Sequence, residues 1–498
     1  MTNNYILHQE VSKHNSKDDL WVILHGKVYD LTNFLSEHPG GQRIILKYGG
    51  TDATGEFSQI HPREIIDQFL SPDVCKGEIH PDSTLATVEK AETEEEKQVR
   101  LAREKMPNIQ EMYNTFDFES VAKNVLKPEA WAYYSSGSDD EISMRENHNA
   151  FHRIWLKPRV MVDVKNIHMK TRMLGTEVSM PLYITGTALG KLGHPEGELV
   201  LTRAAAETNI IQMIPTLASC SFDEIVDAAL ATQTQWVQLY VNSDRNITKA
   251  FVQHAEKRGI RGLFVTVDAP QLGRREKDMR VKYSDEAPEE MEQKDVNRNE
   301  GAARYISTFI DPSLSWKDLP WLKSITNMPI ILKGVQTSTD AILAFKNGCQ
   351  GIVLSNHGGR QLDFAPSGIE ILPEVMDVLH REEGFNANNF EVYVDGGIRR
   401  GSDIFKAIAL GASGVGIGRP ALFAMSTYGQ AGVTRLIQLL QDELEMCMRL
   451  MGAPTVQHIT RDMVDIRNLK DHFVANPMDH LSHSAYERMV PRGMLSKL

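Results

Sequence analysis

The sequence is organised around the stretch Gly351-Ile-Val-Leu-Ser-Asn-His-Gly-Gly-Arg-Gln-Leu-Asp363. It begins as an apolar run typical of a buried strand and continues into a loop that carries His357 and Arg360. Gly358 and Gly359 allow this loop to turn sharply and to lie close to a flat ligand. A neutral imidazole can accept a proton near pH 7, and a guanidinium can hold a carboxylate through two parallel hydrogen bonds. The stretch predicts a base and an anion-binding group on one rim, although alone it also fits an ordinary strand with a surface loop.

Seven further apolar runs of this kind occur from residue 109 onward. They lie at 181–185, 211–214, 236–241, 262–267, 329–333, 391–394 and 414–417, and helical patterns occur at 196–207, 246–258, 339–347, 402–410 and 430–449. Eight strands that alternate with helices predict an α/β fold, the (β/α)8 TIM barrel. A doubly wound sheet is the alternative, but no GxGxxG motif opens the first unit.

In a TIM barrel, ligands bind at the C-terminal ends of the strands. Polar or glycine-rich segments follow most of the predicted strands, at 185–188, 238–240, 266–268, 333–334, 355–357, 395–399 and 416–419. The glycines after strands 7 and 8 stand where barrels bind phosphate through backbone amides and a helix N-terminus. The pattern therefore predicts a phosphorylated cofactor at this face.

The composition is typical of a soluble globular protein with two or three domains. Of the 498 residues, 41% are apolar and 24% are charged, and the net charge is -12. This negative charge argues against nucleic acid and acidic membrane as partners, and no apolar run is long enough to span a membrane. The cysteines, Cys75, Cys220, Cys349 and Cys447, are far apart and fit a reducing compartment.

The two ends of the chain predict a cellular location. The first six residues lack the basic and apolar regions of a secretory signal and the Arg-rich pattern of a mitochondrial presequence. The last three residues, Ser496-Lys497-Leu498, match a peroxisomal import signal. We expect import into the peroxisome, and a frayed tail without a targeting role is the alternative.

Residues 1–79 predict a separate small module. Two apolar runs flank His25-Gly26 in the pattern of a hairpin, and two His-Pro pairs follow, at His38 and His61. Imidazoles at proline-fixed turns can face each other across a gap and bind a six-coordinate haem iron. Such an iron has no open position and carries electrons. Two loop histidines beside turn-forming prolines are the alternative.

This module resembles an α+β cytochrome b5-type haem domain. The resemblance rests on Trp21-Val22, Gly26-Lys-Val-Tyr-Asp-Leu-Thr32, Phe34, His38-Pro-Gly-Gly41 and His61. It implies that His38 and His61 are the axial ligands of haem b. Residues 80–108 then form a charged hinge, whose second half from Glu94 to Lys105 is predicted to be a solvated helix. Such a tether would hold the module near its partner at high effective concentration.

Residues 109–475 resemble the family of FMN-dependent L-2-hydroxy acid oxidases and dehydrogenases. The matching segments are Tyr133-Tyr-Ser-Ser-Gly137, Arg145-Glu-Asn-His-Asn149, Gln238-Leu-Tyr-Val241, Thr266-Val-Asp268, Leu272-Gly-Arg-Arg-Glu276, Lys333-Gly-Val335, 355–363, Asp395-Gly-Gly-Ile-Arg-Arg-Gly401 and Gly418-Arg-Pro420. The fusion with a haem module is closer still to the flavocytochrome b2 type of L-lactate dehydrogenase. That resemblance implies that electrons pass from FMN to haem b and then to a one-electron acceptor such as cytochrome c.

The resemblance implies a role for each polar residue of the rim. His357 would be the base, Asp268 would pair with the imidazolium, and Lys333 would stabilise the anionic reduced flavin. The substrate would be bound by Tyr133, Tyr240, Arg275 and Arg360. The FMN contacts would be Thr185, Gly186, Thr187, Ala188, Gln238, Thr266, Lys333 and Ser355 at the ring, and Asp395, Gly396, Gly397, Ile398, Arg399, Gly418 and Arg419 at ribityl and phosphate. The same residues serve whether the α-hydrogen leaves as a proton or as a hydride.

Ala188 and Leu217 match the family positions that face the methyl group of lactate. A small apolar pocket favours L-lactate over bulky aromatic acids, although one methylene changes discrimination by only ~1–3 kcal/mol. Glycolate also fits such a pocket.

The sequence departs from the family pattern at two places. Pro215 stands where family members commonly have a serine that touches the flavin, and proline has no amide hydrogen, so that contact is in doubt. Thr216 is a candidate to compensate for it. The hinge at 80–98 contains no tyrosine, so an inter-domain contact from such a residue is absent.

The polar, acidic segment 283–301 is too long for a tight turn and predicts a mobile, protease-sensitive loop over the rim. The resemblance implies that the tail, 476–498, wraps a neighbouring subunit in a homotetramer.

Two other functions stay open: a peroxisomal L-2-hydroxy acid oxidase that passes electrons to oxygen, and a haem electron carrier with an inactive barrel. The peroxisomal signal conflicts with the mitochondrial intermembrane space, the location that the flavocytochrome resemblance implies. A metal-dependent barrel hydrolase is weaker, because no cluster of acidic and histidine ligands occurs at the predicted strand ends.

Overall fold

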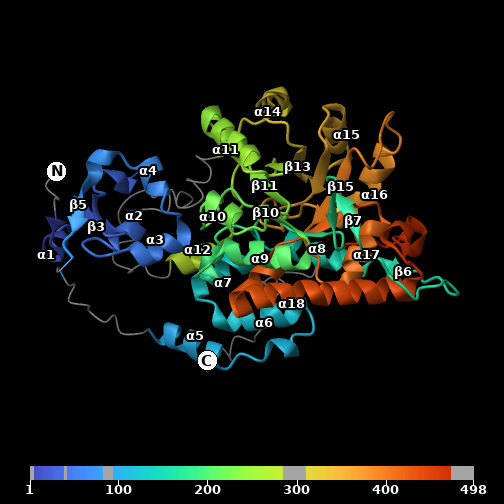
Figure 1. Cartoon of the computed structure of the whole chain (residues 1–498), viewed down its shortest axis with the longest axis horizontal. Coiled ribbons are helices and arrows are strands. Elements are labelled where there is room, and N and C mark those ends of the chain that lie inside the picture. Colours follow the sequence, from blue (N-terminus) through green and yellow to red (C-terminus); the bar gives the residue numbers. More distant parts are fainter. Residues whose placement is uncertain are drawn as a thin grey trace, which may run out of the picture.

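The computed structural model of this chain describes residues 5–36, 38, 42–81, 83, 93–283 and 310–472. Within them lie a five-stranded sheet near the N-terminus and a closed barrel of eight strands. Figure 1 shows the N-terminal module, in blue, beside the barrel, with the linker helix running beneath the barrel helices. These features confirm the predicted fold class, an α+β module followed by a TIM barrel.

The N-terminal module is a small sheet with short helices packed on it. Its strands are β1 (Tyr5–Ile6), β2 (Asn15–Ser16), β3 (Asp19–Leu24), β4 (Lys27–Asp30) and β5 (Cys75–Ile79), and its helices are α1 (His8–Val11), α2 (Gln42–Leu46), α3 (Thr54–Ile60) and α4 (Ile65–Phe69). The predicted hairpin is confirmed, because β3 pairs antiparallel with β4. Its turn residues His25 and Gly26 both have positive φ, as a tight hairpin turn requires.

The linker contains the predicted helix. It is α5 (Glu94–Glu104), and Thr93 begins it with a capping box to Glu96. No residue of α5 is buried, in agreement with its charged sequence. It nevertheless contacts the barrel, because Arg103 Nη1 donates a hydrogen bond of 3.3 Å to the carbonyl of Ser426.

All eight predicted barrel strands are present. They are β9 (Leu182–Ile184), β10 (Ile211–Ile214), β11 (Gln235–Leu239), β12 (Leu263–Thr266), β13 (Ile330–Val335), β14 (Gly351–Leu354), β15 (Glu391–Asp395) and β16 (Gly414–Ile417). All their pairings are parallel, and Ile417 of β16 lies beside Ile184 of β9, which closes the barrel. The doubly wound alternative is therefore wrong. Every residue of these strands is buried, which is why they read as mainly apolar runs with few polar residues.

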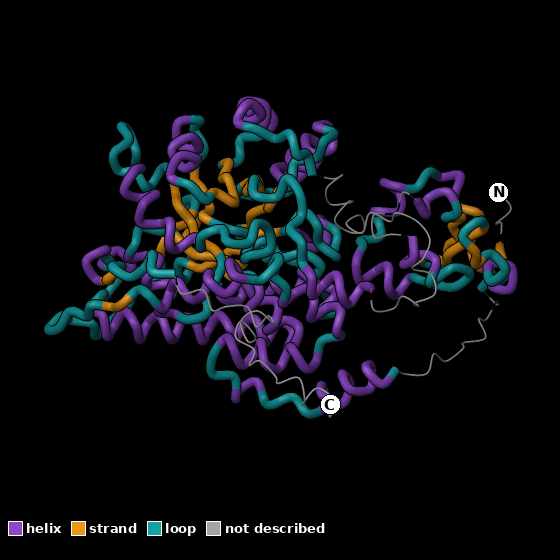
Figure 2. Tube along the Cα trace, turned by 180° about the vertical axis from the view of Figure 1, so that it is seen from behind, coloured by secondary structure: helices purple, strands orange, loops and turns teal. Residues whose placement is uncertain are grey.

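Helices surround the strands, as Figure 2 shows. They are α6 (Thr115–Val125), α7 (Pro128–Ser135), α8 (Ile142–His152), α9 (Glu198–Thr208), α10 (Phe222–Asp227), α11 (Arg245–Lys257), α12 (Glu276–Tyr283), α14 (Leu319–Ile325), α15 (Ser338–Lys346), α16 (Gly368–Leu379), α17 (Gly401–Ala409) and α18 (Arg419–Met451), which bends at Tyr428 and Gly429. Tyr183, Trp236, Phe264 and Tyr393 fill the barrel interior with stacked and edge-on rings. The hairpin of β7 (Thr171–Met173) and β8 (Thr176–Val178) contributes Met173 to this core, and β6 (Trp155–Leu156) pairs with β17 (Val464–Asp465).

Two predicted features, the acidic loop and the C-terminal tail, fall outside the residues that the structure describes. Almost all of the loop at 283–301 and the whole tail at 476–498, including the terminal Ser-Lys-Leu, lie outside the described residues. Among the described helices, none combines the length and the apolar character that crossing a membrane requires.

Candidate active site

His357 lies at the centre of a three-residue hydrogen-bonded chain. It follows β14 with a φ of 58°, and Gly358 and Gly359 also have positive φ, so the backbone turns sharply where the imidazole enters the site. His357 Nδ1 lies 2.9 Å from Asp268 Oδ1, and His357 Nε2 lies 3.3 Å from the hydroxyl of Tyr240. A carboxylate at Nδ1 favours the tautomer with its proton there, which leaves the lone pair of Nε2 directed at the pocket.

Asp268 is held ionised although its side chain is only 1% exposed. Burial by itself would raise the pKa of this carboxyl, but His357 and Lys333 lower the pKa below its ordinary value overall. Its second oxygen, Oδ2, has no hydrogen-bond partner among the described residues. Gly334, at a bulge of β13 with a φ of 106°, makes room for this carboxylate, since a Cβ there would lie 2.5 Å from Asp268 Cγ.

Two guanidinium groups flank the ring of Tyr133. Arg360 Cζ lies 4.9 Å from the ring centre, and Arg275 Cζ lies 5.5 Å from it. The hydrogen bonds of Arg360 within the described chain all use Nη1, to the carbonyls of Tyr133 and Ser136 and the hydroxyl of Ser136, which leaves Nε and Nη2 for a carboxylate. Burial and the charge of Arg275 lower the pKa of Arg360 to about 10, so the Arg360 guanidinium is cationic at neutral pH. This side of the rim is suited to an anion.

Lys333 places a buried positive charge between two carboxylates. Its Nζ lies 3.2 Å from Asp395 Oδ2 and donates a hydrogen bond of 3.3 Å to Ser355 Oγ. Burial alone would lower the pKa of Lys333, but Asp395 and Asp268 raise it overall, so the amine stays protonated. The side chain is 4% exposed and is available to a group that develops negative charge inside the barrel mouth.

The predicted flavin-ring contacts form a polar platform beside Lys333. Gln238 Nε2 donates to Thr266 Oγ1 at 2.9 Å, and Gln238 Oε1 accepts from the amide of Thr216 at 3.0 Å. Thr187 Oγ1 is buried without a partner among the described residues, and Thr185 Oγ1 lies 3.4 Å from Asp395 Oδ2. Buried polar atoms are almost always satisfied, so the open oxygen of Thr187 fits a hydrogen-bonding ligand such as a flavin. Ala188 and Gly186 lie on the same loop.

The departure at Pro215 is accompanied by a compensating contact. Thr216, the next residue, donates its hydroxyl to the carbonyl of Gln238 at 2.7 Å as well as its amide to that side chain. The amide of Tyr240 in turn donates to Thr216 Oγ1 at 3.1 Å. Thr216 therefore orients Gln238 and Tyr240, although it does not replace the amide hydrogen that Pro215 lacks.

The predicted phosphate contacts are only partly gathered. Arg419 donates to the carbonyls of Tyr134, Gly358 and Ser136 at 2.9, 2.8 and 2.7 Å, and burial lowers its pKa to about 9. Arg399 Nη1 instead lies 2.6 Å from Glu119 of α6. Gly396, Gly397 and Gly418 present backbone at this end, whereas the Ile398 side chain is buried in the apolar core. A phosphate role for these residues stays a prediction.

The predicted methyl pocket joins two loops. The amide of Leu189, which follows Ala188, donates to the carbonyl of Leu217 at 3.3 Å. Leu217 packs against Tyr240, Ala269 and Ile310 in one apolar cluster. Ala269 and Ile310 were not predicted to belong to this pocket, because no sequence motif or hydrophobic periodicity marks them.

Three buried polar side chains beside the site have no role predicted from the sequence. Asn147 of α8 and Asn356, the neighbour of His357, exchange hydrogen bonds of 2.8 and 2.9 Å. Glu198, at the start of α9, is fully buried and accepts from the amides of Gly190, Ser219 and Cys220. The position of Asn356 between Ser355 and His357 was a usable signal, but its partner lies 209 residues away in the chain.

The two predicted haem ligands face each other in the N-terminal module. The ring centres of His38 and His61 are 6.4 Å apart, with 76° between the ring planes. Burial and the neighbouring His38 lower the pKa of His61 to about 4, so its imidazole is neutral and keeps a lone pair for a metal. This arrangement fits a bis-His haem iron.

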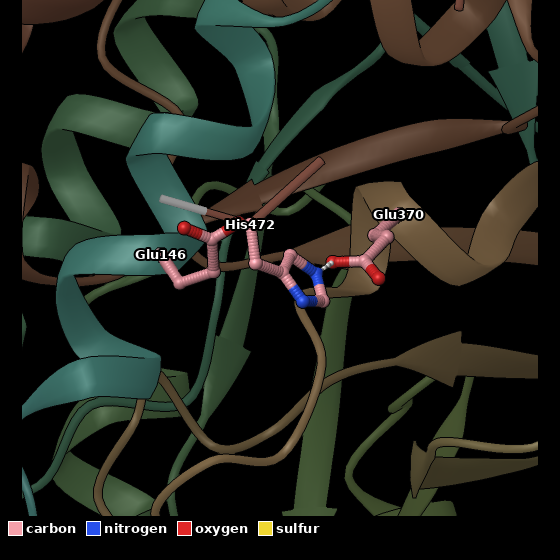
Figure 3. A group of neighbouring side chains, drawn as sticks. All are labelled: Glu146, Glu370 and His472. Atoms are coloured by element: carbon pink, nitrogen blue, oxygen red, sulfur yellow. Dashed lines mark hydrogen bonds and ion pairs between the residues drawn. The ribbon is translucent and has the colours of Figure 1, made fainter. Parts of the chain in front are cut away.

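A second group of polar side chains joins α8, α16 and His472. Glu146 of α8, Glu370 of α16 and His472 are shown in Figure 3. His472 Nε2 lies 2.8 Å from Glu370 Oε2, and Arg153 pairs with Glu146. Arg153 also lies 4.0 Å from Glu370, so the described side chains form an ion-pair network that includes His472.

Comparison with known proteins identifies the two modules. The family model "FMN-dependent dehydrogenase" matches residues 122–466, and "Cytochrome b5-like Heme/Steroid binding domain" matches residues 8–80. The chain is 51% identical to L-lactate dehydrogenase (cytochrome) of Wickerhamomyces anomalus, over 96% of this chain and 83% of the relative, and 47% identical to that of Saccharomyces cerevisiae, over 96% and 82%.

Solved structures agree with these matches. The recombinant flavin-binding domain of baker's yeast flavocytochrome b2 is 47% identical, with a TM-score of 0.72 over 80% of this chain and 98% of that chain. A mandelate oxidase with (S)-2-phenylpropionate is 34% identical, with a TM-score of 0.62 over 71% and 98%. The chain therefore belongs to the FMN-dependent dehydrogenase family, carries a cytochrome b5-like domain at its N-terminal end, and uses FMN and haem as cofactors.

Proposed function

We propose that this protein oxidises L-lactate to pyruvate and passes the electrons from FMN to haem b and then to a one-electron acceptor protein such as cytochrome c. The observation that carries the proposal is the alignment of both modules with relatives named L-lactate dehydrogenase (cytochrome), over 96% of this chain. The hydrogen-bonded chain of Asp268, His357 and Tyr240 supplies the base that this reaction needs.

His357 accepts a proton from the substrate at Nε2. The ionised Asp268 at Nδ1 stabilises the imidazolium that forms and keeps the ring oriented. The Tyr240 hydroxyl, 3.3 Å from the same Nε2, is positioned to bond the substrate oxygen on the carbon that reacts. Because the pKa of Tyr240 is raised by burial and by Asp268, this hydroxyl stays protonated and remains a donor.

The carboxylate of the substrate binds between the two arginines. Arg360 presents Nε and Nη2 to it, the Tyr133 ring contacts both guanidinium groups, and Arg275 adds positive charge at the same end. Two parallel charge-assisted hydrogen bonds fix the orientation of a short acid, so its C2 faces both His357 and the platform of Gln238 and Lys333.

This platform would hold FMN, which would supply an acceptor for the two electrons that leave C2 of the substrate. Lys333 contributes a buried positive charge that would stabilise negative charge on the flavin ring. Gln238, Thr187 and Ser355 provide hydrogen-bonding atoms that fix the ring plane.

The apolar wall of Leu217, Ala269 and Ile310 beside Tyr240 limits the substrate side chain to a small group. This favours L-lactate and also accommodates glycolate. The preference is open to test by comparing kcat/KM for L-lactate, glycolate and (S)-mandelate. A preference for mandelate would contradict a closed, small pocket.

An oxidase is the second candidate. Glycolate oxidase 3 of Arabidopsis thaliana is 41% identical over 70% of this chain, and a peroxisomal (S)-2-hydroxyacid oxidase of the same plant is 40% identical over 72%. These alignments leave out more than a quarter of this chain, whereas the dehydrogenase alignments do not. The two candidates separate in one assay: L-lactate, air and ferric cytochrome c are mixed with the holoenzyme. The dehydrogenase reduces cytochrome c and forms little peroxide, and an oxidase forms one peroxide for each pyruvate.

We further propose that copies of this chain associate, as in a homotetramer. Trp155, Val160 and Leu450 are 70%, 83% and 70% exposed in the single chain, and association would cover apolar side chains of this kind. Light scattering coupled to size-exclusion chromatography tests this, and a mass of 56.0 kDa would contradict it.

The cellular location depends on the electron acceptor. A location in the mitochondrial intermembrane space fits cytochrome c as the acceptor, and a peroxisomal location fits oxygen. Fluorescence microscopy distinguishes the two locations. We also propose that the haem module ends at residue 79, the hinge at residue 108 and the barrel at residue 475.

A further inference from the structure

Ser219 joins the N-terminal module to the barrel. It lies in the loop between β10 and α10 and is fully buried. Its hydroxyl donates a hydrogen bond of 3.1 Å to the carbonyl of Gln59, which belongs to α3 of the haem module. The same oxygen accepts from the amide of Lys191 in η4 (Gly190–Leu192) at 3.3 Å. One small side chain therefore ties together three segments from both modules.

The barrel side of this contact is stiff. The buried carboxylate of Glu198 accepts from the amides of Gly190, Ser219 and Cys220 at 2.8, 3.0 and 3.1 Å. A carboxylate with three amide donors fixes the start of η4 and the loop after β10 relative to each other. Ser219 is consequently presented to the haem module from a fixed platform, and not from a loose surface loop.

The two partners of this hydrogen bond are close in sequence to both redox sites. Gln59 is in the last turn of α3, two residues before the haem ligand His61, which caps that helix. Ser219 is two residues after Leu217, which packs against Tyr240 in the substrate pocket. Figure 1 shows α3 at the edge of the module that faces the barrel.

We propose that Ser219 is the docking contact through which the haem module is held in its electron-accepting position. The hydrogen bond to Gln59 fixes α3, and with it His61, at one distance from the loops that border the flavin platform. This inference rests on the proposed function, because it assigns a structural basis to the electron transfer between the two cofactors.

The redox balance of the step is simple. Oxidation of one L-lactate to pyruvate releases two electrons and two protons. Each electron converts one ferric haem to ferrous haem, so two successive transfers, with reoxidation of the haem by the acceptor between them, empty the reduced flavin. Ser219 changes no bond in this sequence and acts only by positioning.

The test uses the holoenzyme with Ser219→Ala and, as a matched control, Ser324→Ala. Ser324 donates to the carbonyl of Trp321 on the exposed surface of the barrel, away from both sites. Anaerobic stopped-flow mixing with L-lactate follows flavin bleaching and haem reduction separately. In S219A the bleaching rate stays within about twofold of the parent, whereas haem reduction slows about tenfold, as expected when a part-buried carbonyl loses its donor and the module is held less firmly. S324A changes neither rate.

A second readout is independent of turnover. Hydrogen exchange in the oxidised holoenzyme, without substrate, measures the protection of the amides of residues 54–61. We expect faster exchange at these amides in S219A, with an intermediate effect in Ser219→Cys, which keeps the side-chain size but is a weaker donor. The cysteine variant also serves if the alanine variant fails to bind FMN.

Unchanged haem reduction together with unchanged exchange in S219A and S219C would overturn the assignment of Ser219. If the parent protein shows no flavin bleaching with L-lactate, the proposed function has failed instead, and the exchange measurement still decides whether Ser219 docks the module.

Discussion

Replacement of Gly334 by alanine should disable the base without removing any catalytic group. An added Cβ would lie 2.5 Å from Asp268 Cγ, whereas ordinary contacts begin near 3.4 Å, so the carboxylate has to withdraw by about 0.9 Å. A shift of that size is enough to take the 2.9 Å contact between Asp268 and His357 beyond hydrogen-bonding distance. Displacement of about 1 Å in a catalytic group costs roughly 10²-fold in rate.

The φ of 106° at Gly334 adds a backbone penalty, and Gly384→Ala is the control for it. Gly384 has a φ of 80° and open space around its Cβ, so G384A carries a similar strain of ~1–2 kcal/mol with no effect on Asp268. We expect G334A to lower kcat for L-lactate about 10²-fold with little change in KM, while G384A keeps the parental kcat. Steady-state kinetics, with FMN content measured on each variant, provide the comparison. A kcat in G334A within threefold of that of G384A would refute the role given to this close approach.

Four further outcomes are expected. Arg360→Lys should raise KM for L-lactate by roughly 10–100-fold in steady-state assays, because an ammonium cannot form the paired hydrogen bonds, and an unchanged KM would place the carboxylate elsewhere. Leu217→Ala should raise the kcat/KM ratio of (S)-mandelate to L-lactate by about tenfold, and an unchanged ratio would remove Leu217 from the pocket. His61→Ala should abolish the haem absorbance while L-lactate still bleaches the flavin, and a retained bis-His spectrum would exclude His61 as a ligand. The folded-state pKa of Asp268 is lowered, so this carboxylate stabilises the fold above its unfolded pKa, and that stability is lost as pH falls through the folded pKa. The melting temperature of Asp268→Asn should therefore decline less below pH ~4 than that of the parent. Equal declines would contradict the lowered pKa.

The barrel was predictable because its strands are buried on both faces. Each strand then reads as an apolar run with no alternation, and the polar residues that follow it mark the ligand-binding end. Three titratable residues stand directly at such strand ends: His357, Asp268 and Lys333. Closure of the barrel therefore brings them together.

The supporting contacts could not be predicted, since they depend on side chains that are far apart in sequence. Asn147 and Asn356 are 209 residues apart, and Ser219 and Gln59 are 160 residues apart. Asn147 and Asn356 both stand in segments that carry the family resemblance, but no local pattern shows that the members of either pair are in contact. Arg399 illustrates the converse: its motif predicted a phosphate contact, but its position after β15 also brings it within 2.6 Å of Glu119, which competes for the guanidinium.

Electron transfer from lactate to the haem can be observed by anaerobic stopped-flow mixing of the holoenzyme with L-lactate, with flavin and haem absorbance recorded together. We expect the flavin to bleach first and the haem then to be reduced at a comparable rate, without oxygen. A flavin that bleaches while the haem stays oxidised until air is admitted would exclude transfer to the haem and favour the oxidase.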